Sequence, residues 1–255
     1  MNKRALIIGG SSGIGLATVK KLAKNGFKVD LIHRDRRQQV QLLQDEINQI
    51  DPNGDAIRSY NVDGTNKEKV QRTVEGLFEY SKGQYQIVVH ALSRGNLKPI
   101  VSKERKLEIQ DFNLTIESMG INLNVWTQSL LEKNLIGQGS RIVGLTSEGN
   151  ERVWPGYGAV GIAKSTLETL CNYLAVELAP MGVNVNVIQA GVTDTPSLRL
   201  IPEVENLIET SIKRNPKNRL TTPEDVANAI YLLTLPEADW INGSLIHVDG
   251  GEHLI

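Results

Sequence analysis

Two side chains suited to proton donation lie in the segment 145–164, LTSEGNERVWPGYGAVGIAK, where Tyr157 precedes Lys164 by seven residues. Seven residues are two turns of helix, so both side chains would lie on one helical face. A lysine charge beside a tyrosine makes the phenol a better donor to an oxygen that gains negative charge. The position four before the lysine, the other common arrangement, holds Val160. A surface tyrosine and a solvated lysine could have the same spacing by chance. Whether the pair is functional therefore depends on the rest of the chain.

Length and composition predict one α/β domain over residues 1–255. Apolar residues make up 40% of the chain, which is enough for a substantial core, and the net charge of −1 gives no footprint for nucleic acid. The single cysteine, Cys171, excludes an internal disulfide framework and is expected in the core. The histidines show no metal-ligand spacing, so no metal is expected. No stretch is long and apolar enough to cross a membrane, and we expect a cytoplasmic protein with no signal peptide.

Short apolar runs alternate with amphipathic segments along the whole chain. This pattern predicts a Rossmann-type, doubly wound parallel sheet of about seven strands, with right-handed crossovers. The expected strands are Arg4–Gly9, Lys28–His33, Ala56–Val62, Gln86–Ala91, Ser140–Thr146, Val183–Gln189 and Ser244–Val248. The expected helices are Gly13–Asn25, Arg36–Ile50, Lys67–Lys82, Lys103–Lys133, Tyr157–Ala179 and Pro223–Leu233.

The least regular segment follows the sixth expected strand. It holds Pro196, Pro202 and Pro216, with a short helical pattern over 203–212. Segments that follow strand carboxyl ends border the ligand crevice of such sheets. We therefore expect residues 196–218 to form a mobile lid over a substrate.

The first strand ends in a glycine-rich turn that opens a helix. Strand, turn and helix together predict binding of a dinucleotide pyrophosphate by backbone N–H groups at the helix N-terminus. The turn supplies Gly9, Ser11, Ser12, Gly13, Ile14 and Gly15.

The end of the second strand bears on which dinucleotide is bound. An acid there would bind a free ribose 2′-hydroxyl, but this position holds His33, and Arg34 follows. Basic groups suit a 2′-phosphate, so the sequence favours NADPH over NADH. The alternative is that Arg34, Arg36 and Arg37 form a solvated helix start.

With these motifs in place, the chain resembles the short-chain dehydrogenase/reductase family over essentially its whole length. The resemblance rests on the glycine turn, the tyrosine–lysine helix and further short motifs along the chain. These are Asn61-Val62, Val89-His90-Ala91, the run Ala190 to Thr195 and the ending Val248-Asp249-Gly250-Gly251.

Departures from the common family pattern are informative. Ile8 replaces the usual threonine, His90-Ala91-Leu92-Ser93 replaces Asn-Asn-Ala-Gly, and Ala190 replaces a proline. The asparagine expected in the fourth helix falls on Met119, with Asn122 and Asn124 nearby. With these changes and the Tyr-x6-Lys spacing, the chain resembles the enoyl-acyl-carrier-protein reductases, most of all the NADPH-dependent FabL type.

The resemblance implies reduction of a trans-2-enoyl thioester, with Tyr157 and Lys164 as catalytic residues. Ser147 stands where ketoreductases of the family keep a catalytic serine, so it either binds a substrate carbonyl or simply starts a loop. The remaining cofactor contacts implied by the family are Asn61, Val62, His90, Ala91, Leu92, Lys164, Gly191, Val192 and Thr195. The family also implies a homotetramer.

Three other functions stay open from the sequence. One is a 3-ketoacyl or other carbonyl reductase that uses Ser147 with Tyr157. Another is an enone reductase of specialised metabolism, and the third is a non-catalytic cofactor-binding sensor. An acyl carrier protein is a candidate partner, because Lys213, Arg214, Lys217 and Arg219 could attract an acidic surface, although a solvated charged segment would look the same.

Overall fold

Seven parallel strands form one sheet in the computed structural model, which describes residues 3–80 and 83–255. Their order across the sheet is β3-β2-β1-β4-β5-β6-β7. Every strand begins and ends within one residue of its predicted bounds. They are β1 (Arg4–Ile8), β2 (Lys28–His33), β3 (Ile57–Asn61), β4 (Ile87–His90), β5 (Arg141–Ser147), β6 (Asn184–Ala190) and β7 (Leu245–Val248).

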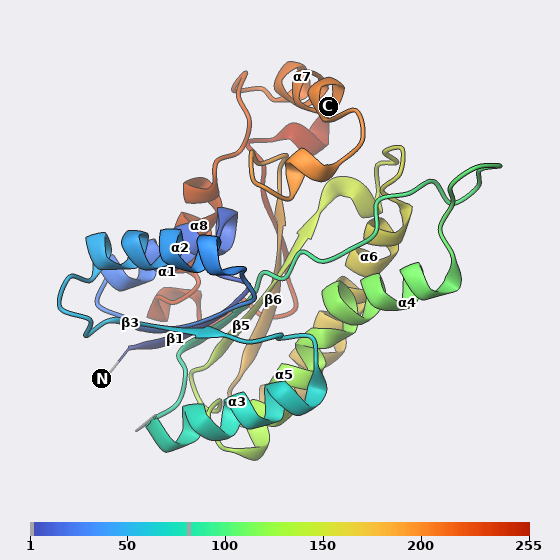
Figure 1. The fold of residues 1–255 in the computed structure, drawn as a ribbon. Coiled ribbons are helices and arrows are strands. Elements are labelled where there is room, and N and C mark those ends of the chain that lie inside the picture. The colour runs from blue at the N-terminus through green and yellow to red at the C-terminus, as the bar shows by residue number, and fades with distance from the viewer. Residues whose placement is uncertain (1–2, 81–82) are drawn as a thin grey trace.

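Helices cover both faces of the sheet (Figure 1). One face carries α1 (Gly13–Lys24), α2 (Arg37–Ile50) and α8 (Pro223–Leu232). The other carries α3 (Lys67–Tyr80), α4 (Ile109–Ile116), α5 (Asn122–Glu132) and α6 (Gly158–Leu178). The short helix α7 (Val204–Arg214) lies apart, in the connection that follows β6. The predicted doubly wound α/β architecture is therefore confirmed.

Alternate residues of each strand serve the two halves of the core. In β1, Leu6 and Ile8 belong to the cluster that includes Trp126 of α5, while Ile7 packs with Leu22 of α1 on the opposite face. Burial on both faces explains why the strands read as continuous apolar runs. Cys171 is buried in the α6 side of the core, as predicted.

The chain direction across the sheet reverses between β1 and β4. Strands β2 and β3 are added on one side of β1, and β4 to β7 on the other. Ligands of doubly wound sheets bind at such a switch point, outside the strand carboxyl ends. The fold therefore places the ends of β1, β4 and β5 at the expected position of a site.

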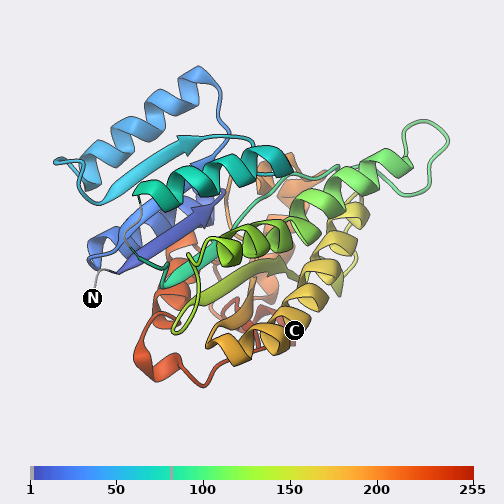
Figure 2. The same cartoon turned by 90° about the horizontal axis from the view of Figure 1, so that it is seen from below.

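The predicted long helix 103–133 is wrong in its first turns. Residues 103–108 form an irregular loop that projects from the body of the molecule (Figure 2), and α4 begins only at Ile109. Glu108 and Asp111 form a capping box, and Lys98 binds the Asp111 carboxylate at 2.8 Å. These contacts start the helix late although the charged residues before it favour helix.

Two further helix predictions need comment. The predicted third helix extended to Lys82, whose last two positions lie outside the described residues. The start of α8 agrees with the sequence: Thr222 caps it, Pro223 is its first residue, and Asp225 completes a capping box. Among the described residues, no helix has both the length and the apolar character needed to cross a membrane.

Candidate active site

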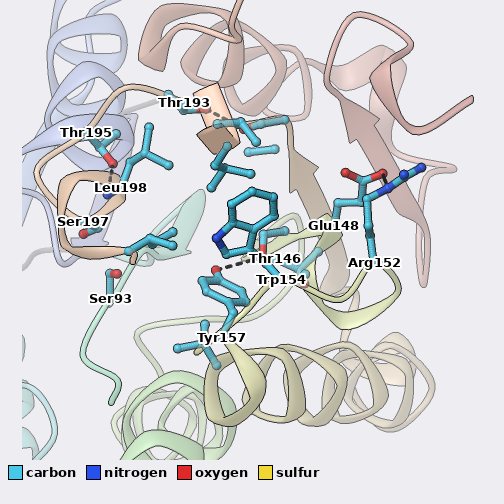
Figure 3. Close-up of a pocket in the computed structure, with 18 of the residues that line it drawn as sticks. Ser93, Thr146, Glu148, Arg152, Trp154, Tyr157, Thr193, Thr195, Ser197 and Leu198 are labelled. Carbon is cyan, nitrogen blue, oxygen red and sulfur yellow. Dashed lines mark hydrogen bonds and ion pairs between the residues drawn. The ribbon is translucent and has the colours of Figure 1, made fainter. Parts of the chain in front are cut away.

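Ser147 and Tyr157 meet in the lining of one pocket. Ser147 ends β5 and Tyr157 caps the N-terminus of α6, and their hydroxyl oxygens lie 3.2 Å apart. The Tyr157 side chain projects into the pocket beside Trp154 (Figure 3). Burial raises the pKa of the Tyr157 phenol, and the bond to Ser147 partly offsets this. The pair thus places two hydroxyl groups where one substrate oxygen could meet both.

A glycine lets the Tyr157 ring take this position. Gly149 lies in the turn after β5, and a Cβ there would run into the Tyr157 ring edge. A Cβ on Gly161 would in turn meet the Gly149 carbonyl oxygen. Helix α6 therefore packs closely against the turn, and the Tyr157 ring lies against Gly149.

The Lys164 ammonium is bound by the backbone of β5 rather than by the phenol. Its Nζ donates to the Leu145 carbonyl oxygen at 2.7 Å, and the side chain is buried. Burial lowers its pKa to about 8, which the charge of Glu168 partly opposes. Tyr157 and Lys164 line the same groove, and no direct bond joins them in the described residues. That they act together in one reaction stays a prediction.

Val160 fills the position where a tyrosine four before the lysine would stand. It is buried in a small apolar cluster with Met119 and Ala163, packed against Tyr157. Met119 lies in a π-helical turn, Glu117–Ile121, that joins α4 to α5 and lines both the pocket and the groove. This side of the site consequently offers apolar atoms and no proton donor.

His90 at the end of β4 is turned away from the groove. Its Nε2 lies 3.2 Å from Asn122 Oδ1, and Asn122 donates to the Gly64 carbonyl oxygen at 3.0 Å. Complete burial and the nearby Lys164 charge lower the pKa of His90 to about 4. His90 is therefore neutral at physiological pH, and it supports the strand end instead of lining the cofactor groove as predicted.

A groove beside the pocket runs from the glycine turn to Lys164. A Cβ at Gly9, whose φ is +91°, would lie 2.7 Å from the Ala91 carbonyl oxygen. The N-cap Ser12 makes no side-chain capping bond, so the first-turn N–H groups of α1 are available to an anion. These features fit a dinucleotide pyrophosphate, and Ser11, Gly13, Ile14, Ala91, Leu92 and Thr195 line the same groove.

The end of the groove beside β2 holds charged pairs that the sequence did not predict. Asp63 accepts from Arg34 at 2.8 Å and lies 3.7 Å from Arg94. Hydrogen bonds from Thr65 and Arg34 hold the pKa of Asp63 at about 2, although burial opposes this. Their partners are distant in sequence, so only the fold brings them together.

The predicted residues at the end of β2 divide into two kinds. Arg34 and His33 both line the groove, as predicted. Arg34 is half exposed, whereas His33 is buried with its Nδ1 2.8 Å from Asp35 Oδ2. Asn61 does not line the groove. It exchanges hydrogen bonds with the Asp35 backbone at 3.0 and 3.1 Å, so it holds the loop in which Arg34 lies. Val62 lines the groove as predicted.

The remaining predicted residues lie elsewhere around the site. Gly15 is buried under the turn, where a Cβ would strike the Gly9 carbonyl oxygen. Gly191 and Val192 line the substrate-side pocket, and Thr195 lines both cavities.

Part of the predicted lid forms one wall of that pocket. Leu198, Ile201 and Leu207 line it, and the Trp154 indole donates to the Pro202 carbonyl oxygen at 3.1 Å. The segment is thus tied to the loop before α6.

The basic cluster proposed as a docking surface is largely neutralised. Arg214 lines the pocket and binds the Glu148 carboxylate, with a side chain only 13% exposed. Lys213 pairs with Glu209 at 2.6 Å, and Arg219 pairs with Asp225. Arg214 is accordingly a wall residue of the pocket and not a free surface cation.

A nucleotide groove at the switch point, joined to a Ser–Tyr–Lys site, defines an oxidoreductase of the short-chain dehydrogenase/reductase class. Residues 9–253 match the sequence model of a family described as Enoyl-(Acyl carrier protein) reductase. The chain belongs to this family of short-chain dehydrogenase/reductases.

Three relatives illustrate the likeness. The enoyl-[acyl-carrier-protein] reductase [NADH] FabI of Enterococcus faecalis is 33% identical over 190 residues, covering 71% of this chain and 73% of the relative. The 1-cyclohexenylcarbonyl-CoA reductase of Streptomyces collinus is 28% identical over 254 residues, covering 98% and 87%. The crystal structure of the enoyl-[acyl-carrier-protein] reductase (NADH) of Aquifex aeolicus has a TM-score of 0.85 at 26% identity, covering 99% and 97%.

Proposed function

We propose that this protein reduces the carbon–carbon double bond of a trans-2-enoyl thioester with NADPH. The placement of the proton donor carries the proposal: Tyr157 reaches the pocket from the N-cap of α6, while Val160 leaves the conventional tyrosine position apolar. A ketone accepts hydride at the carbon that bears its oxygen. An enoyl thioester accepts hydride two carbons away from the carbonyl carbon, so a donor for its oxygen has to lie further along the pocket.

The side chains of the site have separate tasks in this reaction. A reduced nicotinamide cofactor, when bound, supplies the hydride. Tyr157 donates a hydrogen bond to the thioester oxygen as charge develops there, which lowers the barrier without tightening substrate binding equally. Lys164, a buried cation at the end of the groove, favours that negative charge. The apolar wall formed by Trp154, Leu198 and Leu207 excludes water from the acyl chain.

The charged groups at the end of β2 support NADPH. Both acids there already have partners, because Asp35 binds His33 and Asp63 binds Arg34. A 2′-phosphate would compete with Asp63 for Arg34 and gain a charge-assisted bond. The relatives from Enterococcus faecalis and Aquifex aeolicus are named for NADH, so the preference proposed for this chain rests on these residues.

The three relatives named above support the reaction type, although others are named as an aldehyde reductase-like protein and a tropinone reductase homolog. Two of the three are named as enoyl reductases of acyl carrier protein substrates, and the third is named for a cyclohexenylcarbonyl-CoA substrate. Each name describes an unsaturated acyl group on a carrier protein or coenzyme A. We infer the same substrate class for this chain, on acyl carrier protein or coenzyme A.

One observation favours a carbonyl reductase as the second candidate. The Ser147 hydroxyl lies 3.2 Å from the Tyr157 hydroxyl, and this pair could hold a ketone oxygen. In that case the two hydroxyls act together on the carbon that accepts hydride. The enoyl activity is preferred because it explains the tyrosine at position 157 and the apolar Val160 together.

Two substrates assayed side by side test the proposal. Crotonyl-CoA and acetoacetyl-CoA are each supplied with NADPH, and the loss of NADPH absorbance is followed with wild type and Tyr157→Phe. The proposal expects turnover of crotonyl-CoA that depends on Tyr157. Turnover of acetoacetyl-CoA alone would establish the carbonyl reductase instead.

We also propose a homotetramer that uses the outer face of α6 and the π-helical turn Glu117–Ile121. Ile162, Tyr173 and Val176 are apolar residues of α6 exposed to solvent at 42%, 66% and 75%. Ile121, in the π-helical turn before α5, borders the same shallow hollow as Ile162 and Tyr173. Contiguous apolar surface of this kind marks an interaction face. Sedimentation velocity of wild type and Tyr173→Glu would test this, since a tetramer should dissociate in the variant.

A further inference from the structure

A second acid–base pair lies within α6, next to the site. Glu168 follows Lys164 by four residues, one helical turn, so the two side chains leave the helix on the same side. Glu168 is only partly exposed, and Lys164 is buried. Among residues 3–80 and 83–255, no cation lies within ion-pairing distance of the Glu168 carboxylate, and Lys164 has a carbonyl oxygen as its partner.

The Glu168 carboxylate is held by the segment that carries Ser147. It accepts from Thr146 Oγ1 at 2.5 Å and from Asn150 Nδ2 at 2.8 Å, both on Oε1. Thr146 directly precedes Ser147, and Asn150 ends the 3-10 turn that follows it. One carboxylate oxygen of Glu168 therefore binds the chain both before and after Ser147 and holds this segment against α6.

Of the titratable groups near Lys164, Glu168 is the one whose negative charge offsets the positive charge of the lysine. His90, from β4, faces Lys164 as a neutral ring, because burial and the lysine charge lower its pKa to about 4. Cys171, one turn beyond Glu168, has a pKa raised to about 12 by burial and stays a thiol. Burial, together with repulsion from Glu151 beyond the 3-10 turn, raises the pKa of Glu168, while its hydrogen bonds and the Lys164 charge oppose this. Among these groups, Glu168 raises the pKa of Lys164 most, against the effect of burial.

We propose that Glu168 is a positioning residue for the reductase site: its charge keeps Lys164 cationic, and its two hydrogen bonds fix the segment that carries Ser147. This rests on the proposed function only in taking Lys164 to act as a cation. Glu168 touches neither cavity, so it acts on the reaction through Lys164 and Ser147. The carboxylate accordingly has an electrostatic part and a structural part, which different variants separate.

Three variants separate the two parts. Glu168→Gln keeps the accepting oxygen and removes the charge, whereas Thr146→Val removes one hydrogen bond and keeps the charge. Glu177→Gln, an exposed acid on the same helix, is the matched control. Lysine labelled with 15N at Nζ in the cofactor-free protein gives the Lys164 titration by NMR without any substrate.

The expected result is a shift of the Lys164 titration by about one pH unit towards acid in Glu168→Gln, with Glu177→Gln unchanged. The alkaline limb of kcat/KM for the thioester should move in the same direction. Thr146→Val should lower kcat by about threefold to tenfold and leave the titration in place. An unmoved Lys164 titration in folded Glu168→Gln would overturn the proposal.

Two safeguards keep the result interpretable. If Glu168→Gln does not fold, Thr146→Val decides: a Lys164 titration that moves in this variant shows that the local structure, not the charge, controls the lysine, and overturns the proposal. A titration that stays in place while kcat falls supports it. Because the NMR titration needs no substrate, failure of the proposed enoyl activity leaves this test intact.

Discussion

The Tyr157 hydroxyl lies 3.2 Å from the Ser147 hydroxyl, although the two residues come from different elements. Ser147 ends β5 and Tyr157 caps α6, and the intervening turn folds back so that Gly149 lies against the tyrosine ring. Either hydroxyl can donate to the other, which leaves the hydrogen of the second hydroxyl free to bond a substrate oxygen. Removing one hydroxyl at a time therefore shows which of the two donates the hydrogen bond that the reaction needs. In enoyl reduction this bond goes to an enolate oxygen, and in carbonyl reduction it goes to a ketone oxygen.

We expect Tyr157→Phe to lower kcat for crotonyl-CoA by about 10²–10³-fold, because it removes a hydrogen bond made mainly in the transition state. Ser147→Ala should lower kcat by less than about tenfold, since Ser147 only orients the phenol in enoyl reduction. Steady-state kinetics of both variants, with the KM for NADPH as a check on cofactor binding, give the comparison. A larger loss in Ser147→Ala than in Tyr157→Phe would point to carbonyl reduction.

Replacement of Arg34 by Ala should raise the KM for NADPH by about tenfold to a hundredfold and leave the KM for NADH nearly unchanged. The reason is the loss of a charge-assisted bond to the 2′-phosphate, which NADH lacks. Arg36→Ala is the matched control, because Arg36 is an exposed arginine two residues on that does not line the groove. Equal effects on both cofactors, or an equal effect of Arg36→Ala, would contradict NADPH specificity through Arg34.

The sequence was informative where local physics decides the structure. The seven strands are continuous apolar runs between polar turns, and each was predicted to within one residue. The glycine turn and the Tyr157–Lys164 pair, predicted from a glycine-rich turn and a seven-residue helical spacing, line one groove. Contacts between distant segments were not predictable: Asp63 with Arg34 and Arg94, and Glu168 with Thr146, depend on the packing of separate loops. The helix start at 103 failed because a tertiary ion pair, Lys98–Asp111, outweighed local propensity.

The pH dependence of the reaction should follow Lys164. Its pKa is lowered to about 8, mainly by burial, so the cationic form is lost as the pH rises through about 8. We expect kcat/KM for NADPH, which reports the free enzyme, to fall above that pH. His90, with a pKa of about 4, is neutral throughout and gives no acid limb above about pH 5. A profile flat to pH 9.5 would contradict a catalytic requirement for the lysine charge.

Gly149→Ala should reduce activity by displacing the Tyr157 ring. The added methyl group would overlap the ring edge, and the Tyr157 hydroxyl would then move out of reach of its target. We expect kcat to fall by about tenfold or more while circular dichroism shows an intact fold. Gly76→Ala in α3 is the control: nothing lies within 4 Å of its added Cβ, and alanine favours helix by about 0.5–1 kcal/mol. Full activity in Gly149→Ala would contradict this, because it would show that the turn shifts and leaves the Tyr157 ring in place.

Lys164→Met should abolish turnover and yet stabilise the cofactor-free protein at pH 7. The folded-state pKa of about 8 lies below the ordinary 10.5, so the unfolded chain binds the lysine proton more readily than the folded chain does. Burying the charged lysine therefore costs stability in full below about pH 8, by about 3 kcal/mol at most, and the cost disappears as the pH rises towards 10.5. Urea unfolding of wild type and Lys164→Met should show the variant more stable at pH 7, with a smaller difference at pH 9.5. Lys24→Met, an exposed lysine at the end of α1, should show no such pH dependence. A loss of stability in Lys164→Met that is the same at both pH values would mean that the bond to the Leu145 carbonyl outweighs the burial of the charge.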